Sequence, residues 1–444
     1  MMRLTASQWF KAVASLGLLA LIAVAAWLLR EAVLPPKTLE PAEVRAMDSA
    51  QQAEFKTRGA YLVRAGNCMA CHSARGGEPF AGGRGIDTPF GTVYASNLTP
   101  DKGTGLGDWS SSDFWRALHH GQSKNGRLLY PAFPYTNYTQ VTRSDADAMF
   151  AYLQGLEAVT APTPAHTLSW PFNTQAALSA WRALYFSPGV FVPESTQSPE
   201  WNRGAYLVQG LGHCAACHSA RDALGSSRPL DLAGGLIPMQ NWYAPSLSSE
   251  AETGVAEWPI ADIVALLRTG STPRASVLGP MAEVVLHSTQ HMNDADLQAM
   301  TVFLKALPQT KESAPELPAA SRGGAKPLAL ASSALARAGG KIYETNCAQC
   351  HGDSGQGVAG AYPALAGNRA VTLSSPTNLV QIVLNGGYAP ATAGNPRPYG
   401  MPPFLLALND NETAQLLTFL RSAWGNSAGE VSALDVNRAR NLPQ

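Results

Sequence analysis

Three copies of the pattern Cys-x-x-Cys-His stand in this chain of 444 residues, and together they contain all six of its cysteines. Each copy brings two thiols onto one short stretch of chain, directly before an imidazole. No cysteine is left for a disulfide or for a thiol nucleophile. The motif residues are Cys68, Cys71 and His72, then Cys214, Cys217 and His218, and finally Cys347, Cys350 and His351.

Cys-x-x-Cys-His is the attachment signature of a c-type haem. The two thiols add to the haem vinyl groups as thioethers, and the histidine becomes the proximal ligand of the iron. A zinc site would need four converging ligands, whereas successive motifs are separated by about 130 to 150 residues. A thioredoxin-like redox pair would not require a histidine after the second cysteine three times over. The motifs therefore predict three covalently bound haem c groups, each holding one iron.

The bulk properties of the chain agree with one small domain for each haem. A length of 444 residues suggests about three domains. The formal net charge is zero, so no basic field is present to bind nucleic acid. Only 14% of the residues are charged, and Gly and Pro are frequent, which suits small domains whose cores are completed by an apolar cofactor.

The N-terminal segment, residues 1–34, is expected to form a single apolar helix. An uncharged run from Ala12 to Leu29 lies between Lys11 and Arg30 and is just long enough to span a bilayer. The preceding positive charges place the start of the chain in the cytoplasm and the remainder outside. A cleaved signal peptide is the competing interpretation, with Ala23-Val24-Ala25 as the cleavage site. The apolar run continues past that point, which favours a retained anchor.

An internal repeat surrounds the three motifs. Arg58-Gly-Ala-Tyr-Leu-Val63 precedes the first motif, Arg203-Gly-Ala-Tyr-Leu-Val208 precedes the second, and Gly339-Gly-Lys-Ile-Tyr343 opens the third unit. Each stretch predicts a helix that leads into a haem-binding turn. Each unit also closes with a similar helix, whose predicted N-caps stand three residues before an acidic residue. These N-caps are Thr142, Asn293 and Asn409.

The predicted fold is mostly α, with three tandem class I cytochrome c domains preceded by the single N-terminal apolar helix. The domains are expected at 50–156, 198–308 and 332–425. The remaining segments are the anchor or signal segment 1–34, a Pro-rich linker at 157–197 with a short helix at Asn173–Phe186, a second linker at 309–331, and a tail at 426–444. No signal in the sequence indicates structure in that tail.

Electron-transfer haems usually take methionine as the distal ligand, which raises the potential and blocks small ligands. Met401, in Gly400-Met-Pro-Pro-Phe404, is the only methionine after His351 and is predicted to ligate the third iron. Met281, in Gly279-Pro-Met281, is the corresponding prediction for the second iron. The weaker candidates there are Met292 at the start of the closing helix, Met300 inside that helix, His287 and His291.

The first domain does not fit this pattern. Phe133 stands near the place where a methionine is expected. Met69 lies inside the haem motif, and Met149 matches a core position of the closing helix. His119 or His120 could ligate the iron and give a haem of lower potential. An open or water-bound iron is the other alternative, and the residues alone do not decide between them.

Residues 54 to 425 resemble the three-haem cytochrome c subunits of membrane-bound bacterial dehydrogenases, which serve alcohol, gluconate, sorbitol, fructose and aldehyde oxidation. This resemblance implies a periplasmic subunit that takes electrons from a separate catalytic subunit with a pyrroloquinoline quinone, flavin or molybdenum centre. It also implies delivery of the electrons to ubiquinone or to a terminal oxidase. Family members often carry methionine in place of Phe133 or of Val141. The resemblance rests on Thr88–Thr92, Ser96–Asp101, Leu129–Ala132, Trp242–Pro245, Gly279–Val285, Pro363–Asn368 and Met401–Phe404.

Substrate oxidation is expected on the partner, because no nucleotide-binding loop, separate metal motif or nucleophile triad is present. The linker helix and the loop at His119 resemble a branch near molybdenum-containing aldehyde dehydrogenases, and a quinoprotein alcohol dehydrogenase is the other expected partner. The predicted location is the periplasmic side of the bacterial inner membrane, with the N-terminal helix as transmembrane anchor. Two alternatives remain, namely a donor to an oxidase without a dedicated dehydrogenase and a haem enzyme with an open first haem.

Overall fold

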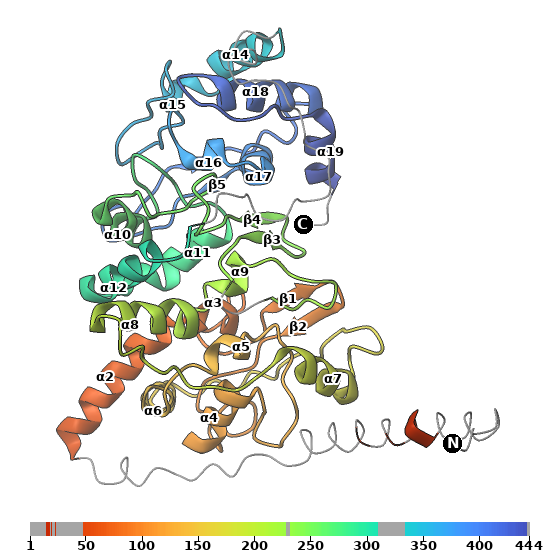
Figure 1. The fold of residues 1–444 in the computed structure, drawn as a ribbon, viewed down its shortest axis with the longest axis vertical. Coiled ribbons are helices and arrows are strands. Elements are labelled where there is room, and N and C mark those ends of the chain that lie inside the picture. Colours follow the sequence, from red (N-terminus) through yellow and green to blue (C-terminus); the bar gives the residue numbers. More distant parts are fainter. Residues whose placement is uncertain are drawn as a thin grey trace, which may run out of the picture.

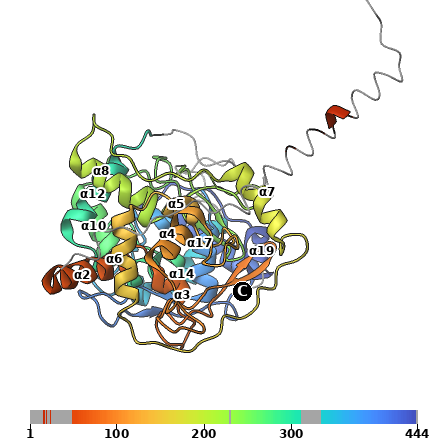
Figure 2. The same ribbon diagram turned by 90° about the horizontal axis from the view of Figure 1, so that it is seen from below.

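The three units of the chain are stacked in one column. The computed structural model describes residues 48–227, 231–309 and 334–441, together with positions 15–17, 19 and 23. Domain 1 lies at the bottom, domain 2 in the middle and domain 3 at the top (Figure 1). Seen from below, the units lie over one another (Figure 2). Helices dominate each unit, which confirms the predicted mostly-α class.

The predicted N-terminal anchor, residues 1–34, lies outside the described residues apart from those five isolated positions. Within the part of the chain that the structure describes, no helix is both long and apolar enough to cross a membrane. The second linker, residues 309–331, also lies outside the described residues except for residue 309.

Each unit has a leading helix, a short helix at the haem motif, a middle helix and a closing helix. Each also has one two-stranded antiparallel hairpin. Domain 1 and its linker contain α2 (Ser49–Ala65), α3 (Cys68–His72), β1 (Gly85–Thr88), β2 (Gly91–Tyr94), α4 (Ser111–His120), α5 (Tyr135–Tyr138), α6 (Arg143–Leu153) and α7 (Gln175–Tyr185). Domain 2 contains α8 (Pro199–Ala205), η2 (Tyr206–Leu211), α9 (Ala215–His218), β3 (Gly235–Ile237), β4 (Trp242–Ala244), α10 (Ile260–Thr269), α11 (Pro280–His287), η3 (Thr289–His291) and α12 (Asp294–Lys305). Domain 3 contains α14 (Ala334–Asn346), α15 (Ala348–His351), α16 (Arg369–Thr372), α17 (Thr377–Asn385), β5 (Gly387–Tyr388), β6 (Gly400–Met401), α18 (Asp410–Ser422) and α19 (Ala433–Asn441).

The leading and closing helices of each unit cross in backbone contact at a glycine. A Cβ atom on Gly59 would lie 1.9 Å from the carbonyl oxygen of Ala148. The equivalent distance is 2.0 Å from Gly204 to Ala299 and 2.0 Å from Gly339 to Gln415. Any side chain at these positions would therefore push the two helices apart. The repeated glycine thus determines how closely the two terminal helices of every unit approach.

The three closing helices begin at the predicted N-caps. The hydroxyl of Thr142 accepts a bond from the backbone N–H of Asp145 at 3.2 Å. Asn293 does the same for Asp296 at 2.8 Å, and Asn409 for Glu412 at 3.0 Å. These bonds satisfy one of the free N–H groups at each helix start. The prediction of capped closing helices is confirmed in all three units.

Domains 1 and 2 share one core of buried apolar side chains, whereas domain 3 has a core of its own. Arg203 pairs with Asp296 at 2.7 Å, and Tyr61 of domain 1 donates its hydroxyl to the same carboxylate at 2.6 Å. The arrangement is reciprocal, because Tyr206 of domain 2 donates to Asp145 of domain 1 at 2.5 Å.

Arg58 forms the ion pair with Asp145 that completes this symmetry. Burial raises the pKa of Asp296, but the bonds from Arg203 and Tyr61 outweigh this effect and hold the pKa below its usual value. In domains 1 and 2, the leading helix therefore supplies an arginine to the closing helix of its own domain and a tyrosine to the closing helix of the other domain. In domain 3, Ala338 and Lys341 stand at the arginine and tyrosine positions. That domain therefore lacks both groups, in agreement with its separate core.

The C-terminal tail is structured, although no signal in the sequence indicates this. Helix α19 packs on α17 and α18. Val431 and Val436 are fully buried there, and Arg440 pairs with Asp410 at 2.7 Å. The segment is therefore part of domain 3, and its apolar positions are recognisable only once the surface that they cover is known.

Replacing Gly204 by alanine should lower the free energy of unfolding by about 3 kcal/mol, because the new methyl group collides with the backbone of α12. Urea unfolding, followed by circular dichroism, measures this change. Gly394→Ala is the matched control, since its Cβ would meet nothing within 4 Å. Equal stabilities of the two variants would contradict the proposed role of the glycine crossing.

Replacing Tyr206 by phenylalanine should cost about 1.5 to 3 kcal/mol, because it removes a hydrogen bond to the buried carboxylate of Asp145. Tyr388→Phe provides the control, since that side chain is 75% exposed in domain 3. The midpoint of urea unfolding is the readout. An unchanged midpoint in Tyr206→Phe would show that the hydrogen bond from Tyr206 to Asp145 does not hold domains 1 and 2 together.

Candidate haem sites

The histidine of every motif is held in the same way by a backbone carbonyl. The Nδ1 atom of His72 lies 2.6 Å from the carbonyl oxygen of Ser96. The corresponding distance is 2.7 Å from His218 to Pro245 and 3.0 Å from His351 to Pro363. A carbonyl oxygen can only accept, so Nδ1 carries the proton in each case. The lone pair is therefore on Nε2, the atom that can bind a metal.

The surroundings of the motifs keep these groups uncharged. Burial lowers the pKa of His72, His218 and His351, so the imidazoles are neutral and available as ligands. Burial also raises the pKa of the Cys68 thiol to about 12. The same cause raises the pKa of Cys214 to about 12 and that of Cys347 to about 11. Reactive redox cysteines have lowered pKa values, so a thioredoxin-like role is disfavoured.

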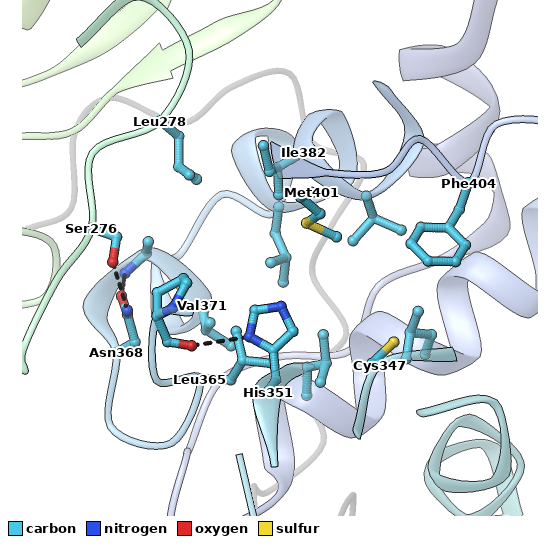
Figure 3. Close-up of a pocket in the computed structure, with 16 residues that line it drawn as sticks. Ser276, Leu278, Cys347, His351, Leu365, Asn368, Val371, Ile382, Met401 and Phe404 are labelled. Atoms are coloured by element: carbon cyan, nitrogen blue, oxygen red, sulfur yellow. Dashed lines mark hydrogen bonds between the residues drawn. The ribbon is translucent and has the colours of Figure 1, made fainter. Parts of the chain in front are cut away.

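Domain 3 contains an apolar cavity beside its motif. Cys347 and His351 lie on one side of it, and Met401 faces His351 from the other side (Figure 3). Apolar side chains of α16, α17 and α18, with Pro363, Leu365 and Phe404, line most of the remaining wall. This arrangement fits a covalently attached haem. Cys347 can hold the haem, His351 can bind the iron on one side, and Met401 can bind it as the distal ligand on the other.

A loop of domain 2 completes the wall of this cavity. Ser276 and Leu278 line it, although both precede Met281 in the chain of domain 2 (Figure 3). The Nδ2 atom of Asn368 donates to Oγ of Ser276 at 3.3 Å. The backbone N–H of Arg369 also bonds to the carbonyl of Arg274 at 2.8 Å. The cavity of domain 3 is thus joined to the loop that carries the predicted ligand of domain 2.

In domain 2, the candidate distal ligands occupy different environments. Met281 lies near the start of α11 and is half-buried. Met292 and Met300 are each only 4% exposed and belong to the apolar core. His291 is exposed, and its Nε2 atom lies 3.2 Å from the carbonyl oxygen of Leu286. His287, at the end of α11, is half-buried. The assignment of Met281 stays a prediction that this placement supports.

In domain 1, the two candidate histidines lie at the C-terminal end of α4. The ring of His119 stacks on Trp115, and its Nδ1 atom lies 2.7 Å from the carbonyl oxygen of Thr139. Burial, with His119 and Arg182 nearby, lowers the pKa of His120 to about 4. Both imidazoles are therefore packed into a polar cluster beneath α7.

The apolar face of the linker helix α7 mostly packs on the haem domains. Leu178 is buried, and Trp181 donates its indole N–H to the carbonyl of Leu224 in domain 2 at 3.0 Å. Leu184 is the exception and is 70% exposed. Packing against the domains is therefore the main role of the face that also contains Tyr185.

The carbonyl partners of the histidines are not apparent from sequence reasoning. Any residue offers a carbonyl, so no side-chain identity announces this role. The one available signal is that Ser96, Pro245 and Pro363 lie within the short segments that carry the family resemblance. Those segments therefore hold the proximal histidines.

The fold and the sites define a c-type cytochrome with covalently bound haem. The family model described as cytochrome c matches residues 57–157 and 336–424. The chain is 39% identical over 394 residues to the alcohol dehydrogenase (quinone), cytochrome c subunit, of Gluconobacter oxydans, covering 86% of this chain and 81% of that protein. It is 38% identical over 407 residues to the gluconate 2-dehydrogenase cytochrome c subunit of Pantoea cypripedii, covering 89% and 91%.

A third relative is the diheme cytochrome c-type protein of Cereibacter sphaeroides. It is 34% identical over 258 residues, which cover 57% of this chain and 86% of that protein. The chain belongs to the family of cytochrome c subunits of dehydrogenases. The expected cytochrome c fold and the resemblance to dehydrogenase subunits are confirmed.

Replacing Met401 by alanine should open the distal side of the third haem. We expect the variant to bind one more carbon monoxide per chain than the parent protein, and one haem potential to fall, because the thioether both blocks small ligands and raises the potential. Met300→Leu is the matched control, since Leu416 occupies the same helix position in domain 3. Unchanged carbon monoxide uptake in Met401→Ala would contradict the assignment.

Proposed function

We propose that this chain is a three-haem electron relay. It accepts electrons from a separate periplasmic dehydrogenase subunit and delivers them to ubiquinone or to a terminal oxidase. The observation that carries this proposal is the triple recurrence of a Cys-x-x-Cys pair beside a histidine whose Nδ1 atom is bonded to a carbonyl. Such a histidine presents Nε2 to an iron in a fixed orientation.

The residues of the chain have three tasks in this relay. The six cysteines hold the haems, and the three histidines bind the irons from the proximal side. Met281 and Met401 bind the second and third irons from the distal side. When bound, each haem supplies one-electron chemistry between ferric and ferrous iron. The apolar walls exclude water, which limits reorganisation when charge arrives or leaves.

The packing of the domains supports a continuous path with domain 2 in the middle. Burial raises the pKa of Cys71, and the nearby Cys217 and Glu283 contribute to this shift, so the first and second motifs are close neighbours. Arg84 of domain 1 pairs with Glu283 at 3.0 Å. The contacts of the Ser276 loop join domain 2 to domain 3 in turn.

The names of the relatives support a dehydrogenase partner that oxidises an alcohol or a sugar acid. An alcohol or gluconate dehydrogenase is favoured over an aldehyde dehydrogenase, because cytochrome c subunits named for the first two are 38–39% identical to this chain. The location on the periplasmic side of the inner membrane and the anchoring by residues 1–34 belong to the same proposal.

The test is to purify the tagged full chain from membranes together with the subunits that accompany it. Addition of the partner's substrate, chosen from alcohols, aldehydes and gluconate, should reduce the haems within the complex. A soluble ubiquinone analogue should then reoxidise them. Absorbance in the visible region follows both steps.

The isolated chain is the control for this experiment. It should be reduced by dithionite but by none of the three substrate classes, because the proposal assigns substrate oxidation to the partner subunit. Turnover of a substrate by the isolated chain would contradict the proposal. So would a haem content below three per chain, measured as the pyridine haemochrome.

A further inference from the structure

The loop that carries the distal ligand is anchored at two equivalent points in domains 1 and 2, with one residue more between these points in domain 1. In each, a glycine follows the middle helix in a left-handed conformation, with φ of 58° at Gly121 and 76° at Gly270. The carbonyl of Gly121 accepts from the N–H of Leu129 at 2.8 Å, and that of Gly270 accepts from Val277 at 2.8 Å. These bonds bring the two loops into register.

The next turn of both loops places Phe133 at the position of Met281. The N–H of Phe133 bonds to the carbonyl of Tyr130 at 3.0 Å, and that of Met281 bonds to Leu278 at 3.2 Å. Phe133 is the fourth residue after Leu129, and Met281 is the fourth residue after Val277. The sequence alone suggests only that Phe133 is near the ligand position, whereas the backbone bonds make the two residues equivalent.

Domain 3 follows the same plan with a longer loop. Gly386, with φ of 66°, follows its middle helix, and the adjacent Gly387 pairs with Met401 across the β5–β6 hairpin. Met401 faces His351 across the cavity (Figure 3). Two of the three distal loops thus present a thioether, and the third presents a phenyl ring, which has no donor atom.

His119 does not occupy a position that faces the iron. Counted back from the glycine that ends the middle helix, it corresponds to Leu384 of domain 3. That leucine does not line the haem cavity, whereas Ile382 and Val383 do. The Nδ1 atom of His119 is also bonded to the carbonyl of Thr139.

The remaining candidates in domain 1 are His120 and Met149. His120 corresponds to Asn385, which does not line the cavity of domain 3. Met149 is fully buried in α6, at the position of Met300 in domain 2 and of Leu416 in domain 3. Leu416 lines the cavity of domain 3 although Met401 faces the histidine there, and Met300 belongs to the apolar core of domain 2, so this helix position supplies apolar wall and core in both units.

We infer that Phe133 replaces the axial methionine of the first haem, so that His72 is the one protein ligand of that iron and its sixth position accepts a small neutral diatomic ligand. This inference rests on the proposed function, because it presupposes the haem on Cys68 and Cys71. The ring of Phe133 is half-buried and packs 5.3 Å, centroid to centroid, from Tyr138. Tyr138 in turn donates to the carbonyl of Gly66 at 2.8 Å, so the ring of Phe133 lies near the first motif and offers an iron no donor atom.

Carbon monoxide titration of the full chain, carrying its haems and reduced with dithionite, tests the inference. The parent protein should take up one carbon monoxide per chain, and its oxidised spectrum should show one high-spin haem out of three. Phe133→Met should supply the missing thioether, abolish the uptake and make all three haems low-spin. Phe133→Leu is the matched control and should keep the uptake, because it also lacks a donor atom.

The outcomes separate this inference from the proposed function. Three haems per chain with no carbon monoxide uptake in the parent protein would overturn the inference and leave the relay intact. If the parent protein takes up no carbon monoxide but the His119→Gln variant does, His119 is the ligand of the first iron instead. Fewer than three haems would contradict the proposed function itself.

Discussion

The backbone contact between the first and last helices of each unit is the constraint on which the rest of the molecule depends. Gly59, Gly204 and Gly339 allow these helices to approach until a Cβ atom no longer fits. The haem motif directly follows the first helix, and the closing helix supplies the wall of the pocket, as Leu416 and Leu420 do in domain 3. The helix separation therefore determines the width of the space beside each histidine. A core completed by a covalent cofactor needs such a defined frame, because the cofactor cannot shift to fill a poorly shaped gap.

The same leading helices also determine which units join. Tyr61 and Tyr206 reach across to the carboxylates that Arg203 and Arg58 neutralise, so each ion pair is completed by the neighbouring domain. A buried carboxylate is costly unless it is fully bonded. Separation of domains 1 and 2 would remove one bond from each of two such groups and expose their common core. Domain 3 has neither group, and it adheres instead through the Ser276 loop that closes its cavity and through Asn378 of α17, which bonds to the backbone of Tyr243 in β4. The column is thus a rigid pair of units with a third attached.

Much of this could be predicted from the sequence, because it is encoded locally. The haem motifs, the capped closing helices and the linker helix each depend on a few adjacent residues, and the structure contains the predicted leading, closing and linker helices. The tyrosine exchange joins residues 235 positions apart and leaves no local trace. Its only sign is that Arg58-Gly-Ala-Tyr61 is repeated in unit 2 and not in unit 3. The tail helix was likewise beyond prediction, since the apolar character of Val431 and Val436 gains meaning only from the surface that they cover.

The position of the first haem in the column bears on why a phenyl ring is tolerated there. Domain 2 lies between its two neighbours in the column and is bonded to both of them (Figure 1). A change of ligand in the middle unit would alter every transfer through the chain. A change in an end unit alters only the step into or out of that unit. Loss of the methionine lowers the potential of the first haem relative to its neighbours, so an electron placed there moves downhill toward domain 2. With Phe133 in domain 1 as inferred, and Met281 and Met401 as the ligands proposed for domains 2 and 3, this order of groups favours transfer from the first haem to the third.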